Sequence, residues 1–324
     1  MPKAIRFHKT GGPEVLVWED VEVGDPGPGQ LRIRQRAIGL NFVDTYQRSG
    51  LYPMPLPSGC GSEGAGVVEA VGASVTEFKP GDRVAYSSAP VGAYSEARLY
   101  PADRAVKLPE AISFDTAAAM MLKGMTVQYL IKRTFKVQSG MTVLWHAAAG
   151  GVGLIACQWL KALGVKVIGT VGSDEKAALA RAHGCEQTIV YTRENFVERV
   201  KELTGGRGVP AVYDSVGKTT FMGSLDCLQP LGTMVNFGSA SGAPEPLNLG
   251  LLAQKGSLFV TRPTLNTYAA KREDLVAIAN DLFDVVGTGK VKIEIAQRYP
   301  LKDAAQAQRD LEARKTTGST ILVP

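Results

Sequence analysis

Short apolar runs alternate with longer amphipathic stretches through the middle of the chain. The short runs are rich in β-branched residues and predict five strands, at residues 142–145, 166–171, 187–190, 209–214 and 233–237. The stretches between them predict three helices, at about 151–163, 174–183 and 194–203. Ser173 is a favourable helix start because two acidic residues follow it, and Gly184 is a favourable helix end. This alternation predicts an α/β domain with a doubly wound parallel sheet.

The first 120 residues have a different texture. Glycines and prolines interrupt short β-branched runs such as 66–72 and 83–87. Residues 79–82, Lys-Pro-Gly-Asp, form a turn signal between these two runs. Little room is left for helix, so we expect a compact, barrel-like β module.

The last part of the chain returns to a mixed pattern. It predicts a helix at 271–286, a strand at 291–295, a helix at about 302–312 and a final strand at 318–323. This tail is too small for a core of its own, so we expect it to return to the first module. The predicted domains are therefore 1–122 together with 265–324, and an inserted domain at 123–264.

Residues 146–153 join the first predicted strand of the inserted domain to its first helix and read His-Ala-Ala-Ala-Gly-Gly-Val-Gly. Glycines let the backbone approach a ligand closely, and a helix N-terminus offers N–H groups and a positive dipole end to a pyrophosphate. With the second strand on schedule, this βαβ unit predicts dinucleotide binding through Gly150, Gly151, Val152 and Gly153. The loop departs from G-x-G-x-x-G spacing, and an ordinary βαβ crossover is the alternative.

The end of the second strand bears on the kind of dinucleotide. Residues 170–173 read Thr-Val-Gly-Ser and lack the acidic residue that binds a ribose 2′-hydroxyl in NAD-specific folds. Asp174 lies slightly further on, where a helix cap is the simpler interpretation. A lysine in the first helical turn can donate a charge-assisted hydrogen bond to a 2′-phosphate. The alternative is that this lysine is only a solvated surface residue. We therefore predict NADPH rather than NADH, held at this end by Gly172, Ser173, Lys176 and Tyr191.

Composition narrows the class of protein. The chain has 324 residues, of which 45% are hydrophobic and 21% charged, as in ordinary globular proteins. No apolar run reaches the roughly 18 residues of a membrane span, and no signal-peptide core is present, so we expect a cytoplasmic protein. The net charge of +5 suits an anionic small ligand and is too mild to argue for nucleic acid. Four scattered cysteines are typical of reduced, structural thiols.

Several long segments together resemble one enzyme family. They occupy residues 38–53, 80–84, 122–126, 146–153, 213–217 and 256–263. In order and spacing they resemble the zinc-independent quinone oxidoreductases of the medium-chain dehydrogenase/reductase superfamily, the ζ-crystallin-like group. The resemblance implies a Rossmann-type domain inserted in a GroES-like β-barrel-type domain and NADPH-dependent reduction of quinones. It also implies a homodimer, in which the strand around 258–260 pairs across the two-fold axis.

The residues at the expected zinc positions argue against a catalytic metal. Zinc dehydrogenases of this superfamily carry a cysteine near position 41 and a Gly-His-Glu motif about twenty residues later. Here those positions hold Asn41 and the run Gly61-Ser62-Glu63, which offers poor zinc ligands. Alcohol oxidation needs a Lewis acid, whereas an electron-poor quinone mainly needs the nicotinamide held against it. We predict no metal cofactor and a quinone acceptor.

The resemblance also implies a set of site residues. On the cofactor these are Asn41, Tyr46, Lys123, Thr126, Gly151, Val152, Ser215, Phe237, Gly238, Ser239, Phe259, Val260, Thr261 and Arg314. For the phenylalanines the alternative is core packing, and for Arg314 it is a cation at a helix end.

On the substrate side we expect Asn41, Tyr46 and Tyr52, which belong to the segment that replaces the zinc site. The amide can hydrogen-bond an acceptor oxygen, and the tyrosines offer flat faces and hydroxyls. Half-buried tyrosines with satisfied hydroxyls are the alternative. Lys123 can stabilise a developing oxyanion by its charge. No general acid is identified, and no histidine is given a chemical role, so positioning is expected to dominate catalysis.

Two other functions stay open. An NADPH-dependent reductase of enones, with an activated C=C bond, would have the same fold and cofactor. An NADPH-regulated RNA-binding or crystallin-like protein would show a basic stripe, and the densest basic run is 32–36, Arg-Ile-Arg-Gln-Arg. That run alternates along a predicted strand, which is also typical of a solvated face.

The cofactor preference can be tested at Lys176. Replacing Lys176 by Ala should raise KM for NADPH and leave KM for NADH nearly unchanged, because only NADPH carries the 2′-phosphate. Steady-state kinetics with both nucleotides measure this, and equal effects on the two would contradict the assignment.

Overall fold

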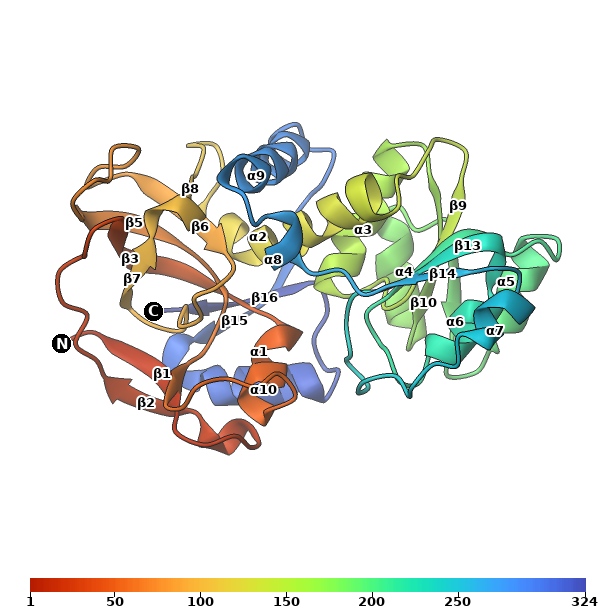
Figure 1. Cartoon of the computed structure of the whole chain (residues 1–324), viewed down its shortest axis with the longest axis horizontal. Helices are drawn as coiled ribbons and strands as arrows, with labels where there is room; N and C mark the ends of the chain where they lie inside the picture. The colour runs from red at the N-terminus through yellow and green to blue at the C-terminus, as the bar shows by residue number, and fades with distance from the viewer. The chain divides into compact units, whose positions relative to one another are not determined.

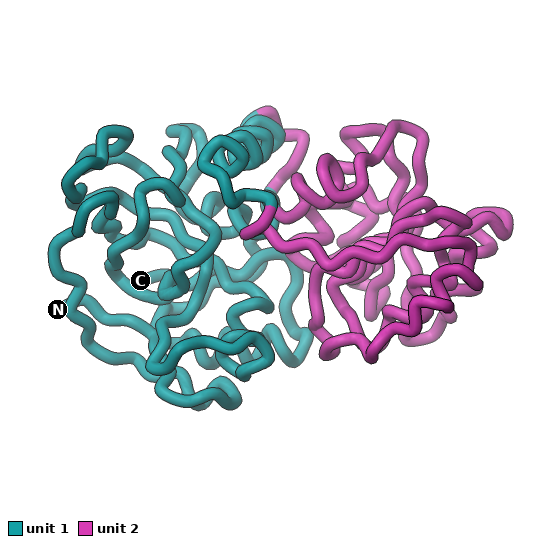
Figure 2. Tube along the Cα trace, in the orientation of Figure 1, with its two compact units in different colours: residues 1–125, 268–287, 293–324 teal, residues 126–267, 288–292 magenta.

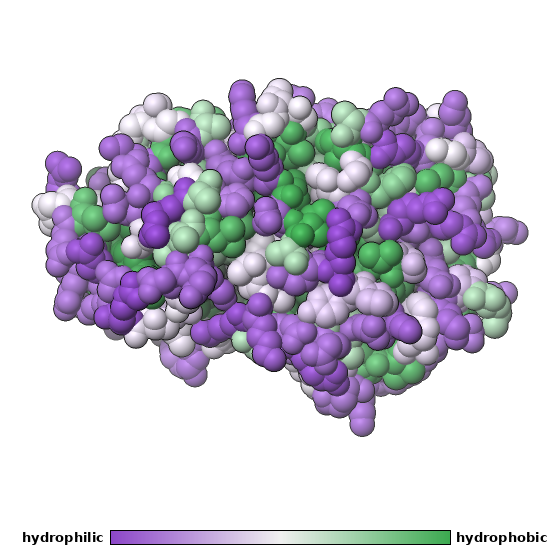
Figure 3. All heavy atoms as spheres, turned by 180° about the vertical axis from the view of Figure 1, so that it is seen from behind, coloured by the Kyte–Doolittle hydropathy of each residue, from purple (hydrophilic) through white to green (hydrophobic).

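The computed structural model describes all 324 residues and divides them into two compact units. Unit 1 consists of residues 1–125, 268–287 and 293–324, and unit 2 of residues 126–267 and 288–292 (Figure 2). Each unit has its own apolar core. No helix has the length and apolar character needed to cross a bilayer. The face drawn in Figure 3 is mostly hydrophilic, with hydrophobic residues in small groups.

Unit 1 is built on two β-sheets. The larger has the strand order β15-β16-β3-β5-β6-β8, with β7 also paired to β3 (Figure 1). Its strands are β3 (Gln30–Leu40), β5 (Glu63–Val71), β6 (Arg83–Ser87), β7 (Ala97–Pro101), β8 (Val106–Lys107), β15 (Ile295–Pro300) and β16 (Ser319–Val323). The smaller has the order β2-β1-β4, with β1 (Lys3–Phe7), β2 (Val17–Asp20) and β4 (Ser58–Gly59). The final strand therefore joins the module formed by the N-terminal residues.

Strand β3 shows why this sheet forms. Leu31 and Ile33 are fully buried in the core of unit 1, while Arg32 and Arg34 alternate with them on the other face. Both arginines bond the carboxylate of Glu69, at 3.2 and 2.5 Å. The basic run is thus a partly neutralised outer face of a strand and gives no support to nucleic-acid binding.

The expectation of little helix in the first 120 residues is wrong. Helix α1 (Phe42–Ser49) begins at a capping box, in which Asn41 and Asp44 bond each other's backbone N–H groups, and ends at Gly50, whose φ is 85°. Helix α2 (Phe114–Tyr129) begins before residue 120 and contains the first passage from unit 1 to unit 2. Residues 117–121 of α2 are all buried, so the segment lacks the amphipathic period by which helices are predicted.

The remaining helical segments of unit 1 are short except for two. Helix α9 (Arg272–Gly287) lies close to the predicted 271–286, and α10 (Ala304–Glu312) follows the 3₁₀ turn η4 (Leu301–Asp303) within the predicted 302–312. The others are the 3₁₀ turns η1 (Pro13–Val15) and η2 (Ala102–Arg104). Helix α8 (Leu265–Tyr268) and the π-helical turn η3 (Leu130–Thr134) lie wholly or mainly in unit 2.

Unit 2 contains a six-stranded parallel sheet with the order β11-β10-β9-β12-β13-β14. Its strands are β9 (Thr142–Trp145), β10 (Lys166–Val171), β11 (Gln187–Val190), β12 (Val209–Asp214), β13 (Leu228–Asn236) and β14 (Phe259–Thr261). Its other helices are α3 (Gly151–Ala162), α4 (Asp174–Ala182), α5 (Phe196–Leu203), α6 (Phe221–Asp226) and α7 (Gly250–Gln254). The strand order reverses between β9 and β12, and ligands of such sheets bind at the carboxyl ends of the strands there. The predicted fold class is confirmed.

Two predicted strands are displaced in the structure. β13 starts five residues before the predicted 233–237, because its first half is only partly buried and carries proline and glycine. The strand predicted at 291–295 is wrong: Val291 is a buried loop residue, and the strand is β15, from Ile295 to Pro300. β15 is an edge strand with no buried residue, so apolar alternation does not reveal it.

Candidate functional site

A buried polar cluster in unit 1 is centred on Glu63, the first residue of β5. Its carboxylate is completely buried and accepts hydrogen bonds from Asn41 Nδ2 at 2.8 Å, the Leu122 backbone N–H at 2.7 Å and Lys123 Nζ at 3.2 Å. The Lys123 side chain is only 7% exposed. Each charge is costly to bury alone, so the two neutralise each other, and the amide and the backbone N–H satisfy the carboxylate's other lone pairs.

The local sequence makes this close packing possible. Gly39 of β3 pairs directly with Glu63 of β5. A Cβ atom on Gly39 would lie 2.1 Å from Glu63 Oε2 and 2.2 Å from the carbonyl oxygen of Ala118 in α2. Only glycine therefore fits between β5 and α2 here. Asn41 follows as the N-cap of α1, which points its amide at the same carboxylate.

Asp44 is a second buried carboxyl group beside this cluster. Its Oδ2 accepts the Asn41 backbone N–H at 2.9 Å and the Tyr94 hydroxyl at 2.8 Å, while Oδ1 has no hydrogen-bond partner. Burial raises the pKa of Asp44 to about 7, against the opposing effect of the Tyr94 and Asn41 hydrogen bonds. Asp44 holds Asn41 in place by anchoring the first turn of α1.

Tyr46 and Tyr52 lie together at the end of α1. Their ring centroids are 5.3 Å apart in an edge-to-face arrangement, and the Tyr52 N–H donates to the Tyr46 carbonyl at 3.0 Å. Tyr46 is only 9% exposed, whereas Tyr52 is half-buried. Tyr52 thus has more surface to offer a ring ligand than Tyr46.

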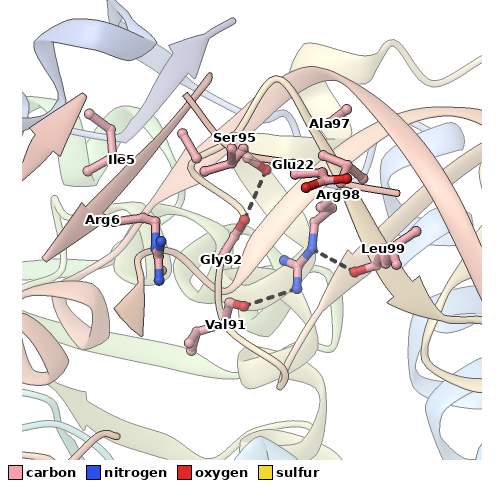
Figure 4. Close-up of a pocket in the computed structure, with 13 residues that line it drawn as sticks. Ile5, Arg6, Glu22, Val91, Gly92, Ser95, Ala97, Arg98 and Leu99 are labelled. Carbon is pink, nitrogen blue, oxygen red and sulfur yellow. Dashed lines mark hydrogen bonds between the residues drawn. The ribbon is translucent and has the colours of Figure 1, made fainter. Parts of the chain in front are cut away.

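A separate cavity of about 310 Å³ in unit 1 lies away from these residues (Figure 4). It is lined by β1, by the segment after β2 and by the stretch from Val91 to Leu99. Arg98, which is 7% exposed, projects at its side and donates to the carbonyl of Val91 at 3.1 Å. None of the predicted site residues lines this cavity.

In unit 2 the glycine loop lies at the carboxyl end of β9. Gly150 is the N-cap of α3, and no side chain caps this helix. A Cβ atom on Gly153 would lie 2.4 Å from the Ala147 carbonyl oxygen, so the tight turn requires glycine there. The first N–H groups of the twelve-residue helix are left for a ligand, and its dipole favours an anion. This arrangement fits a pyrophosphate.

The loops after β10 and β11 bring the predicted 2′-phosphate residues together. The Ser173 hydroxyl accepts the Lys176 N–H at 3.3 Å and caps α4, as predicted. Tyr191 is 43% exposed, and a Cβ atom on Gly172 would lie 3.0 Å from its hydroxyl. The Tyr191 hydroxyl therefore lies directly beside Gly172.

Sequence reasoning missed Arg193 in this region. Its two terminal nitrogens each bond one oxygen of Asp174 at 2.6 Å, and this guanidinium holds the pKa of the Asp174 carboxyl below its usual range. Asp174 is thus neutralised and does not repel a phosphate bound nearby. The sequence signal that could have indicated it is a basic residue two positions after Tyr191, which was already a candidate for the same site.

The other predicted cofactor residues in unit 2 follow strands β12, β13 and β14. Gly238 lets two loops touch, because a Cβ atom there would lie 2.5 Å from the Ser215 carbonyl oxygen. Phe237 is half-buried with its ring centroid 5.6 Å from that of Trp145, and Ser239 is buried. Phe259 is 60% exposed, so core packing does not explain it.

Three further predicted residues complete the set. Thr126 is half-buried in α2, and Val260 and Thr261 are half-buried in β14. Arg314 is exposed in unit 1 just after α10, where its φ of 59° lies in the left-handed region. Asn41, Tyr46, Tyr52, Lys123 and Arg314 thus belong to unit 1 and the other predicted residues to unit 2.

Comparison with known proteins identifies the family. The model of the alcohol dehydrogenase GroES-like domain matches residues 27–110, and that of the zinc-binding dehydrogenases matches residues 151–278. The chain is 58% identical to the quinone oxidoreductase of Pseudomonas aeruginosa over the full length of both. The chain belongs to the quinone oxidoreductase family. The predicted family is confirmed, and the protein is an oxidoreductase.

Two other relatives are informative about chemistry. The crystal structure of the Escherichia coli quinone oxidoreductase complexed with NADPH has a TM-score of 0.98 and 53% identity, covering 99% of this chain and all of that one. A 2-haloacrylate reductase of a Burkholderia species is 48% identical, over all of this chain and 99% of its own length.

Zinc does not fit the residues of this member, despite the name of the second family model. No group of three His, Cys, Asp or Glu side chains is placed to hold a metal ion. The carboxylate of Glu63 is occupied by Asn41, Leu122 and Lys123, and an ammonium 3.2 Å from it would repel a second cation.

The raised pKa of Asp44 predicts a pH-dependent stability. The folded protein holds the Asp44 proton up to about pH 7, whereas an unfolded chain releases it near pH 4, so stability falls as pH rises between these values. The slope should approach about 1.4 kcal/mol per pH unit. Replacing Asp44 by Asn should remove this pH dependence. Urea unfolding between pH 5 and 8 measures the free energy of unfolding of both proteins.

Asp310→Asn provides the control, because that half-buried carboxyl has a lowered pKa and its loss should leave the slope between pH 5 and 8 unchanged. A wild-type slope that survives in Asp44→Asn would contradict the assignment.

Proposed function

We propose that this protein uses NADPH to reduce quinones by hydride or electron transfer, without a metal. The buried cluster of Asn41, Glu63 and Lys123 carries the proposal, because its ammonium and amide bind the carboxylate of the Gly-Ser-Glu run that stands at the expected zinc positions. The carboxyl edge of unit 2 supports the cofactor, as does the NADPH complex of the relative from Escherichia coli. When bound, NADPH supplies a hydride from its nicotinamide ring.

We assign the cofactor-holding roles to residues at the ends of the parallel strands. The N–H groups at the start of α3 bind the pyrophosphate, and Ser173, Lys176 and Tyr191 bind the 2′-phosphate. The loops after β12, β13 and β14 hold the nicotinamide side through Ser215, Phe237, Gly238, Ser239, Phe259, Val260 and Thr261. Thr126, Asn41, Tyr46 and Arg314 complete the set.

On the acceptor side, Lys123 and Asn41 provide the electrostatic contribution. An acceptor oxygen becomes negative as the ring is reduced, and a nearby ammonium stabilises that charge. An ammonium has three donors, of which Lys123 gives one to Glu63. Tyr52 offers the ring face on which the acceptor stacks. The proton comes from water, so the protein supplies position and charge.

A second candidate is the reduction of enones. The 48% identical relative is a 2-haloacrylate reductase, and the same cation would polarise a carbonyl conjugated to a C=C bond. Steady-state assays with matched quinones and enones distinguish the two, and a kcat/KM at least tenfold higher for quinones is expected.

Lys123 provides the direct test of the proposed mechanism. Replacing Lys123 by Met should lower kcat with a quinone by about 10²-fold, the usual effect of losing one oxyanion donor, and change KM for NADPH little. Lys123→Met also leaves Glu63 as an unpaired buried charge, so the matched variant Lys123→Met/Glu63→Gln is measured beside it. Full kcat in the double variant would exclude the role.

We also propose a homodimer that forms through β14. This strand is the edge of the six-stranded sheet. Phe259, in β14, is 60% exposed. Leu231 is 67% exposed and lies close by, because its N–H donates to the carbonyl of Gly256, just before β14. An unpaired edge with apolar side chains is a template for pairing with another strand. Phe259→Glu should therefore shift the mass by light scattering from two chains toward one, whereas Met222→Glu, at another exposed apolar residue of unit 2, should not.

A further inference from the structure

A continuous chain of buried hydrogen bonds runs through the carboxyl edge of the unit 2 sheet. His146 Nδ1 lies 2.9 Å from Thr170 Oγ1, and His146 Nε2 lies 3.0 Å from Ser224 Oγ. Ser224 Oγ in turn lies 3.1 Å from Asp214 Oδ2. All four side chains are at most 2% exposed. Neither the glycine loop nor the phosphate-binding residues account for this chain.

The donors in this chain have one consistent direction. Four donors converge on the Asp214 carboxylate: the N–H groups of Val216 and Gly217 and the hydroxyls of Thr220 and Ser224. With four donors directed at its two oxygens, this carboxylate acts only as an acceptor. Ser224 therefore spends its one proton on Asp214, and its oxygen accepts from His146.

This direction fixes the state of the imidazole. His146 must carry its proton on Nε2, so Nδ1 is bare and accepts the hydroxyl proton of Thr170. Burial lowers the pKa of His146, in agreement with a neutral ring. Every polar atom of the imidazole is satisfied, and removing any one member leaves a buried group without a partner.

The chain joins the ends of three strands. His146 follows β9 and opens the glycine loop, and its N–H donates to the Tyr213 carbonyl of β12 at 3.0 Å. Thr170 is the penultimate residue of β10, two residues before Gly172. Asp214 ends β12 and fixes the turn that contains Ser215 by accepting hydrogen bonds from the N–H groups of Val216 and Gly217. Cofactor contacts are assigned to all three of the loops that follow these strands.

We propose that His146, Ser224 and Asp214 are positioning residues that set the spacing of the three loops for NADPH, with His146 as the neutral Nε2–H tautomer. The inference rests on the proposed cofactor and does not depend on the acceptor. None of these side chains takes part in a chemical step. They hold the backbone donors of the loops in the geometry that the bound dinucleotide needs, so that ordering them costs less on binding.

NADPH binding in the absence of any acceptor tests the proposal. Ser224→Ala and His146→Leu should each raise the dissociation constant for NADPH about tenfold or more, because a buried donor or acceptor is orphaned beside the loops. At saturating NADPH, kcat should stay within about twofold, since no reacting group is lost. His146→Gln keeps an N–H at the Nε2 position and should bind NADPH within about threefold of the wild type.

Thr204→Val is the matched control for a purely structural effect. Thr204 is also a nearly buried hydroxyl of unit 2, which donates to the Val200 carbonyl at 2.7 Å and accepts the Gly208 N–H at 3.0 Å. It lies between α5 and the start of β12, at the other end of the strands. Thr204→Val should lower the unfolding free energy as Ser224→Ala does and leave the NADPH dissociation constant unchanged.

The tautomer has an independent spectroscopic signature. The chain has three histidines, and His183 Nδ1 lies 2.8 Å from the Leu179 carbonyl oxygen, so that ring donates from Nδ1. In ¹⁵N spectra of histidine-labelled protein, the signals that disappear in His146→Gln belong to His146. They should show a protonated Nε2 and a bare Nδ1, whereas a neutral His183 should show the opposite tautomer.

Three results would overturn the proposal. The first is an NADPH dissociation constant that changes no more in Ser224→Ala than in Thr204→Val. This comparison tests the proposal even if His146→Leu does not fold. The second is a His146 ring protonated on Nδ1. The third is a wild-type protein that does not bind NADPH, which would also contradict the proposed function. A protein that binds NADPH but does not reduce quinones would contradict the proposed function alone.

Discussion

The ion pair between Glu63 and Lys123 is the constraint on which unit 1 depends. Either charge would be costly to bury alone, and the two residues are 60 positions apart in sequence. The close approach requires Gly39, because any larger residue would collide with the carboxylate and with α2. The same ion pair leaves Glu63 neutralised by an ammonium, so this carboxylate is a poor ligand for a metal ion.

Unit 2 solves the burial of polar groups in a different way. Asp214 has no charged partner in this network and instead accepts hydrogen bonds from four donors. The neutral ring of His146 extends the network from Ser224 to Thr170. Hydrogen bonds to fixed donors stabilise a buried carboxylate without a counter-ion, so the edge can stay rigid while it carries little net charge. The positive end of α3 is then the local field at the proposed pyrophosphate site.

The sequence predicted the elements of unit 2 well because its central strands are buried on both faces. β9, β10 and β12 lie at the predicted residues, as does the edge strand β11, and a continuous apolar run between glycine-rich turns is a strong local signal. The edge strand β15 and helix α1 were missed or displaced, because the first has no buried residue and the second starts from polar caps. The positions of Asn41 and Lys123 came from family resemblance, whereas their pairing with Glu63 depends on contacts 22 and 60 residues apart, which no local pattern encodes.

The same limit applies to cofactor choice. Sequence alone places Asp174 close to Lys176, and an unpaired carboxylate there would oppose a 2′-phosphate. The fold brings Arg193 from the next loop onto Asp174, so the negative charge is cancelled by a residue 19 positions away. The proposed preference for a phosphorylated ribose is therefore supported by Arg193, which neutralises the carboxylate nearest to Lys176 in sequence. In the proposed assignment, a lysine in the first turn of α4 binds the 2′-phosphate, while an arginine neutralises the neighbouring carboxylate.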